Sequence, residues 1–179
     1  MKQKVDLNDK IFNDENKHQY GKTFVCNHDD AFDGIINYLI KKSNNNIKDL
    51  IDITASSMID NSKTYSPYNV CLFDDNEKYF ESEDQSNSWI CFDFKDHQVI
   101  PSSYIIKSSK NQNNNYPKTW ILEGSNDKTN WKVLDEQKDC SHLNGQYLVH
   151  TFDIQAKVTL PFRYIRMKQT GPNWQENKY

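Results

Sequence analysis

From residue 50 onward, the apolar residues of this sequence fall into short runs that are separated by Asn, Ser, Asp, Gly and Pro. In some runs apolar and polar residues alternate, and the others are short and largely apolar, which is typical of strands with one or both faces buried. The sequence therefore predicts an all-β fold, an antiparallel sandwich or barrel of about eight strands. The runs are LIDITAS, NVCLF, SWICFDF, SYIIKS, TWILEG, WKVLDE, YLVHTFDI and FRYIRMKQ.

The clearest hairpin lies between residues 116 and 136, where the sequence reads YPKTWILEGSNDKTNWKVLDE. Residues 124–130 are expected to turn the chain between two strands. In the first strand Trp120 and Leu122 share one face, and in the second we expect Trp131 and Val133 to repeat that face. Both tryptophans are interpreted as packing residues.

Two segments precede the strands. Residues 1–22 are polar and charged and are expected to form an N-terminal arm or linker, so that one domain occupies residues 23–179. Apolar residues at helical spacing then predict a short helix, with Asp29 or Asp30 as its cap and with Gly34 as a weak point. These apolar residues are Phe32, Ile35, Ile36, Leu39 and Ile40.

The charge pattern narrows the possible partners. The formal net charge is -3 and the isoelectric point about 5.9, with Lys scattered among Asp and Glu, so we expect no nucleic acid partner. No stretch approaches the roughly 18–20 apolar residues of a membrane span, and the first residues lack the apolar core of a secretory signal. We expect a soluble, cytoplasmic protein. Its four cysteines, Cys26, Cys71, Cys91 and Cys140, are expected to be reduced thiols, with Cys71 and Cys91 in strands.

No catalytic pattern stands out in the sequence. GxSxG, Walker and GxGxxG motifs do not occur, and the five histidines have no metal-binding spacing. Cys140 and His142 are two residues apart, which is short of any usual zinc pattern. We therefore expect no enzyme activity, no catalytic residue and, at most, a calcium ion as a cofactor.

Antiparallel strands bring alternate loops to the same end of a sandwich. If each strand from residue 89 onward crosses once, residues 107–116, 136–146 and 170–177 share one end. The loops at 95–102, 124–130 and 155–161 share the other. The first set is longer and rich in amide and aromatic residues, and long loops on a rigid sandwich are the usual place for recognition.

Five segments in order resemble the discoidin domain, also called coagulation factor 5/8 type C, of the galactose-binding-like superfamily. They are ITASS (53–57), NSWICFDF (87–94), YIIKS (104–108), the 116–136 hairpin and FRYIRMKQTG (162–171), and the resemblance spans about residues 51–174. It implies a discoidin-like jelly roll. FDGIINYL before ITASS and QTGPNW after RYIR look most like the discoidin domains of intracellular BTB- and kelch-associated proteins.

That resemblance implies a non-catalytic binding module, and two kinds of ligand stay open. The favoured one is a protein partner within an intracellular adaptor; the alternative is a carbohydrate, a galactose-like sugar. Aromatic rings and amides at one end suit both. The family places a spike after ITASS at that end. The candidate ligand-binding residues are Met58, Ile59, Tyr65, Asn113, Asn114, Tyr116, His142, Asn144, Asn173 and Trp174.

The chain departs from the family pattern in two places. A calcium-binding loop in many sugar-binding relatives corresponds here to FDDNEKYFES, where Asp75 replaces a glycine; Asp74, Asp75 and Asn76 are the candidate calcium ligands. The family also continues after TGxNW into one more strand, whereas this sequence stops at NWQENKY. We expect that the last strand is missing or that residues 24–40 cover the exposed edge.

Overall fold

The computed structural model describes residues 22–24, 32–61, 63–73, 77–110 and 115–175. One α-helix, α1 (Ile35–Lys42), precedes the strands. The described part then contains β1 (Asp52–Ala55), β2 (Trp89–Asp93), β3 (Ser103–Lys107), β4 (Trp120–Ser125), β5 (Lys132–Gln137), β6 (Val149–Asp153) and β7 (Tyr164–Gln169). Short 3-10 helices are η1 (Ile47–Asp49), η2 (Lys63–Tyr65), η3 (Pro67–Cys71) and η4 (Ser141–Leu143).

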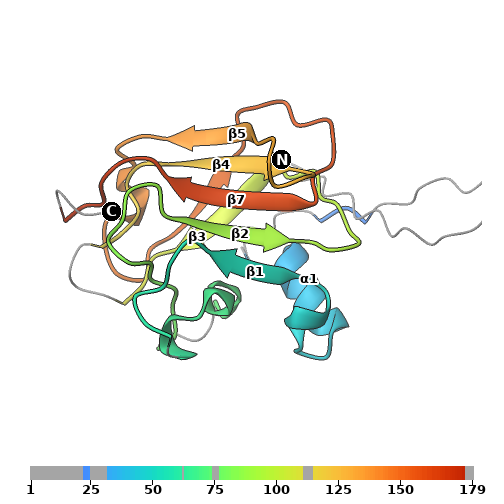
Figure 1. Cartoon of the computed structure of the whole chain (residues 1–179), viewed down its shortest axis with the longest axis horizontal. Coiled ribbons are helices and arrows are strands. Elements are labelled where there is room, and N and C mark those ends of the chain that lie inside the picture. Colours follow the sequence, from blue (N-terminus) through green and yellow to red (C-terminus); the bar gives the residue numbers. More distant parts are fainter. Residues whose placement is uncertain (1–21, 25–31, 62, 74–76, 111–114, 176–179) are drawn as a thin grey trace, which may run out of the picture.

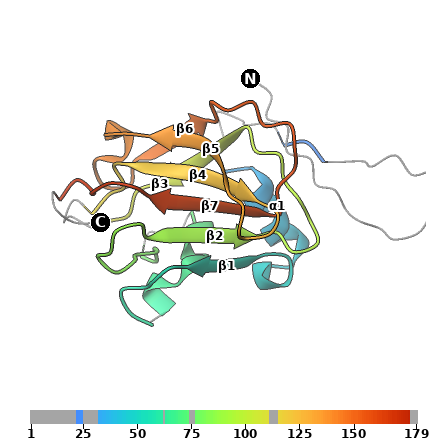
Figure 2. The same cartoon turned by 45° about the horizontal axis from the view of Figure 1, so that its top comes forward.

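The strands form two antiparallel sheets. The larger has the order β1-β2-β7-β4-β5, and the smaller pairs β3 with β6. In Figure 1 the larger sheet faces the viewer and β3 lies behind it, and the tilted view of Figure 2 brings β6 forward at the top. Every strand pair is antiparallel, which confirms the predicted all-β sandwich.

The core between the sheets has three neighbouring parts. One joins α1 and η1 to the β1–β2 end of the large sheet, through Leu39, Ile51 and Ile53. Another surrounds Trp120 and Phe152, and the third surrounds Leu134 and Phe162. Tyr104 of β3 packs against both of the last two, so the small sheet is held to the middle of the large one.

The turn of the β4–β5 hairpin is closed by its own side chains. The Ser125 hydroxyl accepts hydrogen bonds from the amides of Asp127 and Lys128, at 3.2 and 3.1 Å. One Asp127 oxygen accepts the amides of Thr129 and Asn130, at 2.8 and 2.7 Å. Asp and Ser favour turns because short polar side chains can bond to the backbone in this way. The predicted turn is confirmed, although Gly124 and Ser125 still belong to β4.

The prediction of which β5 side chains face the core is wrong, because β5 contains a β-bulge. Leu122 pairs with Asp135, but the next residue, Glu123, pairs with Val133, so Leu134 is an extra residue in β5. One extra residue shifts the side chains beyond it to the opposite face. Leu134 therefore fills the core, while Val133 is 48% exposed on the outer face.

Trp131 likewise lies away from Trp120. Its ring stacks on the Arg166 guanidinium, whose central carbon is 3.8 Å from the ring centroid, and its indole N–H donates to the Lys128 carbonyl at 2.9 Å. Arg166 in turn donates from Nε and one terminal nitrogen to a Glu123 oxygen, at 2.9 and 2.7 Å. Trp131 is a packing residue, as expected, but on the outer face of the sheet.

Two further expectations need correction. The run NVCLF is not a strand: Pro67 and the Ser66 hydroxyl, which accepts the Tyr68 amide at 3.4 Å, begin the 3-10 helix η3 there. Cys71 is therefore a buried thiol of η3, whereas Cys91 lies in β2 as predicted.

The predicted helix exists, but it begins at Ile35 with Gly34 as its N-cap, which explains the glycine. Asp29 and Asp30, like Cys26, lie outside the described residues. None of the helices in the described ranges has the length and apolar character that crossing a membrane requires.

Candidate recognition site at one end of the sandwich

The loops expected to share one end do so. The segment after β5 meets the one before β4, where the Cys140 amide donates to the Lys118 carbonyl at 2.8 Å. The chain after β7 meets the same segment, with the Thr170 amide donating to the Thr119 carbonyl at 3.1 Å. β1 also ends at this side, at the left in Figure 1. We call this side the loop end.

Several large apolar and aromatic side chains at the loop end are exposed. Ile59, after β1, is 47% exposed, and Tyr147, before β6, is 44% exposed. The two residues after Tyr147, Leu148 and Val149, are also exposed. Most soluble domains keep large exposed apolar groups scattered, so three in succession are a notable feature. We call Ile59, Tyr147, Leu148 and Val149 the apolar patch.

Polar contacts hold the backbone around the apolar patch. The Ile59 amide donates to the Glu81 carbonyl at 3.1 Å, and the Glu81 carboxylate accepts the Asn115 side-chain amide at 3.1 Å. The Leu148 amide donates to the Ser108 hydroxyl at 2.8 Å, and this hydroxyl donates to the Gly145 carbonyl at 2.5 Å. Hydrogen bonds therefore hold the backbone at Ile59 and, separately, at Leu148.

Tyr65 and Lys110 lie in the same region but are engaged with neighbours. The ring of Tyr65 meets Tyr79 edge to face, with centroids 5.3 Å apart. The Lys110 ammonium forms an ion pair with Glu77. Burial, followed by the Tyr65 hydroxyl and nearby negative charge, raises the pKa of Tyr79, so it is a neutral hydroxyl at physiological pH.

The other part of the loop end contains His142 and Trp174. His142 is exposed on η4, and its ring stacks on His150 of β6 with centroids 3.8 Å apart and planes 4° apart. Trp174 is half-buried: its N–H donates to the Cys140 carbonyl at 3.3 Å, and the Lys118 ammonium lies 4.8 Å from its ring centroid. We call His142 and His150 the histidine stack.

The structure separates the remaining candidates by exposure. Tyr116 is 3% exposed, so its ring is not available at the surface, and burial raises the pKa of its hydroxyl. Asn173 is buried, with its side-chain oxygen accepting the Gln175 amide at 2.8 Å. Met58 is half-buried and Asn144 is exposed. Asn113 and Asn114 lie outside the described residues.

Sequence reasoning missed Tyr147, Leu148 and His150. The run YLVHTFDI was read as a strand, and three apolar residues at its start fit a fully buried strand equally well. The available signal was position, because this run comes directly after a long polar loop. The spacing of eight residues between the two histidines carries no signal without the fold.

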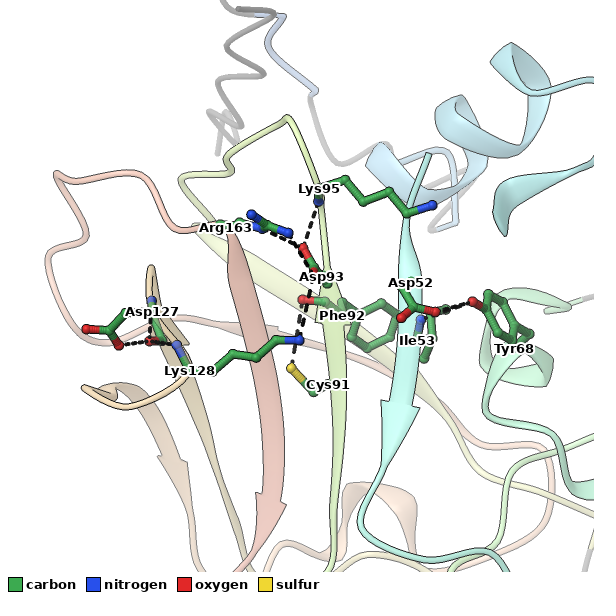
Figure 3. Close-up of polar contacts among 11 residues, drawn as sticks. Asp52, Ile53, Tyr68, Cys91, Phe92, Asp93, Lys95, Asp127, Lys128 and Arg163 are labelled. Carbon is green, nitrogen blue, oxygen red and sulfur yellow. Dashed lines mark hydrogen bonds and ion pairs between the residues drawn. The ribbon is translucent and has the colours of Figure 1, made fainter. Parts of the chain in front are cut away.

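A polar network around Asp93 links segments at the opposite end of the sandwich (Figure 3). Arg163 donates from Nε and a terminal nitrogen to the two oxygens of Asp93, at 2.7 and 3.1 Å. The Lys95 amide donates to the same carboxylate at 2.8 Å, and the Lys128 ammonium is 3.7 Å away. Both oxygens of the carboxylate are thus occupied, which is typical of a structural network and not of a reacting group.

The acid dependence of this network can be predicted. Burial raises the pKa of Asp93, but the Arg163 hydrogen bonds, the Lys95 amide and both positive charges outweigh it and lower the pKa below its usual value. A lowered folded-state pKa means that the contribution is present above the unfolded value of about 3.9 and is lost as the pH falls through the folded value.

We therefore expect Asp93→Asn to cost about 1 kcal/mol at pH 7, because Arg163 is 41% exposed and solvent screens the pair. Urea unfolding at pH 7 and near pH 3 checks this, since the difference in stability between wild type and variant should narrow in acid. A gap that widens in acid would show that the sign is wrong.

No three His, Cys, Asp or Glu side chains of the described ranges are grouped so that they could hold a metal ion. The candidate calcium residues Asp74, Asp75 and Asn76 lie outside those ranges. Calcium binding there stays a prediction.

The fold and the ordered motifs point to one class of domain, and comparison with known families agrees. The model of the F5/8 type C domain matches residues 52–179. The chain belongs to the F5/8 type C, or discoidin, family and is a binding module of that class.

Solved structures share the fold. A module named CpGH89CBM32-5 from Clostridium perfringens, in complex with GalNAc-β-1,3-galactose, is 10% identical; the alignment covers 69% of this chain and 86% of that one, with a TM-score of 0.52. The family 32 CBM of C. perfringens NanJ, in complex with galactose, is 12% identical over 69% of this chain and 85% of that one, with a TM-score of 0.50.

Two curated relatives are much larger proteins. E3 ubiquitin-protein ligase hecd-1 of Caenorhabditis elegans is 29% identical over 75 residues, which is 42% of this chain and 3% of that protein. E3 ubiquitin-protein ligase Ufd4 of Drosophila melanogaster is 24% identical over 94 residues, 51% of this chain and 3% of that protein. The chain thus spans a small fraction of the relatives that it matches.

Proposed function

We propose that this domain binds a protein partner through the apolar patch at its loop end. The observation that carries the proposal is the exposure of Ile59 and Tyr147 together with Leu148 and Val149, on loops that hydrogen bonds hold in place. Burying exposed apolar surface is the main driving force for protein association, and central aromatic residues contribute most to it. Preformed loops also reduce the entropy lost on binding.

The rings expected to stack on a sugar are less accessible. Tyr116 is buried, and Trp174 is half-buried with Lys118 over its ring. A sugar site needs an open aromatic face flanked by free hydrogen-bonding groups. The described residues favour a protein over a sugar for this reason, although the solved structures with the same fold hold sugars. At 10 and 12% identity, those neighbours inform the fold and leave the ligand of this chain open.

The curated relatives also support a role in binding proteins. Segments similar to this chain recur inside two ubiquitin-protein ligases, where they occupy a small part of a large protein. A recurring small module within a larger protein suits an adaptor role, and we extend the proposal to a cytoplasmic adaptor.

The test is a comparison of matched surface variants. We expect the double substitution Ile59→Ser and Tyr147→Ser to lower retention of the partner proteins about 30-fold or more, because the loss of even one hot-spot residue costs about 2 kcal/mol or more. The control is Val133→Ser, which changes an equally exposed apolar residue on the outer face of β5. Quantitative mass spectrometry of proteins co-purifying with each variant measures the ratio.

Two outcomes would contradict the proposal. Equal retention by the double variant and the control would mean that the apolar patch does not bind. Binding of wild type to a galactose-containing glycan on an array, with no protein lost from the double variant, would favour the sugar-binding alternative.

A further inference from the structure

The histidine stack is not explained by the proposed function. His142 lies on η4, in the loop between β5 and β6, and His150 lies on β6 itself. Their rings are parallel within 4° at a centroid separation of 3.8 Å. The stack continues inward, because the His150 ring meets Phe152 at 4.6 Å and Phe152 meets the buried Trp120 at 5.3 Å. A titratable pair is thus coupled directly to the core.

The rest of the η4 loop is fastened by groups that do not titrate near neutral pH. Leu143 is fully buried, the Cys140 carbonyl accepts the Trp174 indole N–H, and the Gly145 carbonyl accepts the Ser108 hydroxyl. On the exposed side of η4, His142 meets β6 through His150 and, at 6.4 Å, through the Phe152 ring. On the buried side, Leu143 packs in the same cluster as Phe152. The loop that the stack fastens also carries Tyr147.

Few charges surround the stack. Among the described residues, the one ionisable group whose charge acts on His150 is His142. On β3, Ile106 lies opposite His150, and Lys107 lies opposite Val149 with its ammonium on the Phe73 carbonyl at 2.7 Å. Tyr104 donates its hydroxyl to Asp135 at 2.8 Å, and on the η4 side Cys140 is a buried thiol. No carboxylate of the described part is paired with either ring to stabilise a second positive charge.

We propose that the histidine stack is an acid-sensitive latch: it holds the exposed side of η4 against β6 while at least one ring is neutral, and protonation of both rings loosens that side of the loop. Two imidazolium rings at stacking distance repel each other, and the half-buried one also loses hydration. The latch does not depend on the identity of any ligand. Where the proposed function holds, acid would also weaken binding at the apolar patch.

The direction of the pH dependence follows from the pKa of His150. Burial lowers its pKa, and repulsion from His142 lowers it further. The folded protein therefore binds protons less readily than the unfolded chain, whose histidine has a pKa of about 6.5. The closed latch is fully stabilised above that value and loses stability as the pH falls through it toward the folded-state value.

The experiment measures amide hydrogen exchange of residues 138–148 at pH 7.5 and 5.5, corrected for the intrinsic rate at each pH. In wild type we expect a loss of protection at the lower pH, because the lowered pKa of His150 makes the closed latch less stable in acid. His142→Phe and His150→Phe keep a ring that can stack but cannot take a proton, so each should abolish the pH-dependent loss. His97→Gln, in the loop after β2, is the matched control and should behave as wild type.

Ring titrations by NMR provide a second readout. The midpoint of His150 should rise in the His142→Phe variant, because its charged neighbour is gone. The proposal is overturned if both phenylalanine variants lose protection in acid as wild type does. It is equally overturned if wild type keeps its protection at a pH where both rings have been protonated. Neither readout depends on a ligand, so failure of the latch and failure of the proposed function are distinguishable.

Discussion

Replacement of Trp120 by alanine is expected to lower the free energy of unfolding by about 3–5 kcal/mol. Trp120 is fully buried, its ring meets Phe152 edge to face at 5.3 Å, and its N–H donates to the Tyr104 hydroxyl at 3.0 Å. Alanine would leave a cavity between the sheets and would also remove the donor that Tyr104 uses. Urea unfolding followed by circular dichroism measures the loss.

Two further variants separate the loss of the ring from the loss of the hydrogen bond and provide an outer-face control. Trp120→Phe keeps most of the ring but not the N–H, so it should cost less, about 1–3 kcal/mol. Val133→Ala, on the outer face, should stay within about 0.5 kcal/mol of wild type. A loss below about 1 kcal/mol for the alanine variant at Trp120 would mean that the hairpin face is assigned backwards.

Gly124→Ala is expected to destabilise the fold by about 3 kcal/mol, because it overpacks the core. A Cβ on Gly124 would lie 2.6, 2.8 and 2.9 Å from three carbons of the Phe162 ring. That ring is buried against Leu122 and Leu134, so it has little room to retreat. The backbone of Gly124 does not have a positive φ, and the cost is therefore steric.

A control substitution and a compensating substitution test this steric explanation. Gly34→Ala should cost less than about 1 kcal/mol, because no atom lies within 4 Å of its added Cβ and the residue is only a helix cap. The double variant with Gly124→Ala and Phe162→Leu should lose less stability than the two single variants lose in sum, since the smaller side chain at 162 frees space. Additive thermal shifts in the double variant would contradict the steric explanation.

Much of the fold could be predicted because its pattern is local. Alternation in ITASS and WICFDF, the polar turn GSNDKTN and the order of five motifs fix strands, turn and family without coordinates. The loop end could also be predicted, since antiparallel strands of one crossing each must bring alternate loops together.

The features that could not be predicted depend on single-residue shifts or on contacts between distant segments. The extra residue Leu134 turns Val133 outward, and nothing in WKVLDE indicates a bulge there. NVCLF reads as a strand until Pro67 and Ser66 begin a 3-10 turn instead. Tyr116 reads as a loop aromatic, but its neighbours bury it. His142 and His150 meet only because η4 folds back on β6.

The bulge at Leu134 also determines where the chain tolerates changes in length. Deleting one residue from β5 would move its neighbours to opposite faces and would expose side chains that the core now holds. Insertions into flexible surface loops cost little by comparison, about 0.6 kcal/mol for each doubling of loop length. Insertions and deletions during evolution are therefore expected to accumulate at the loop end, so that diversification of partners need not alter the sandwich that carries them.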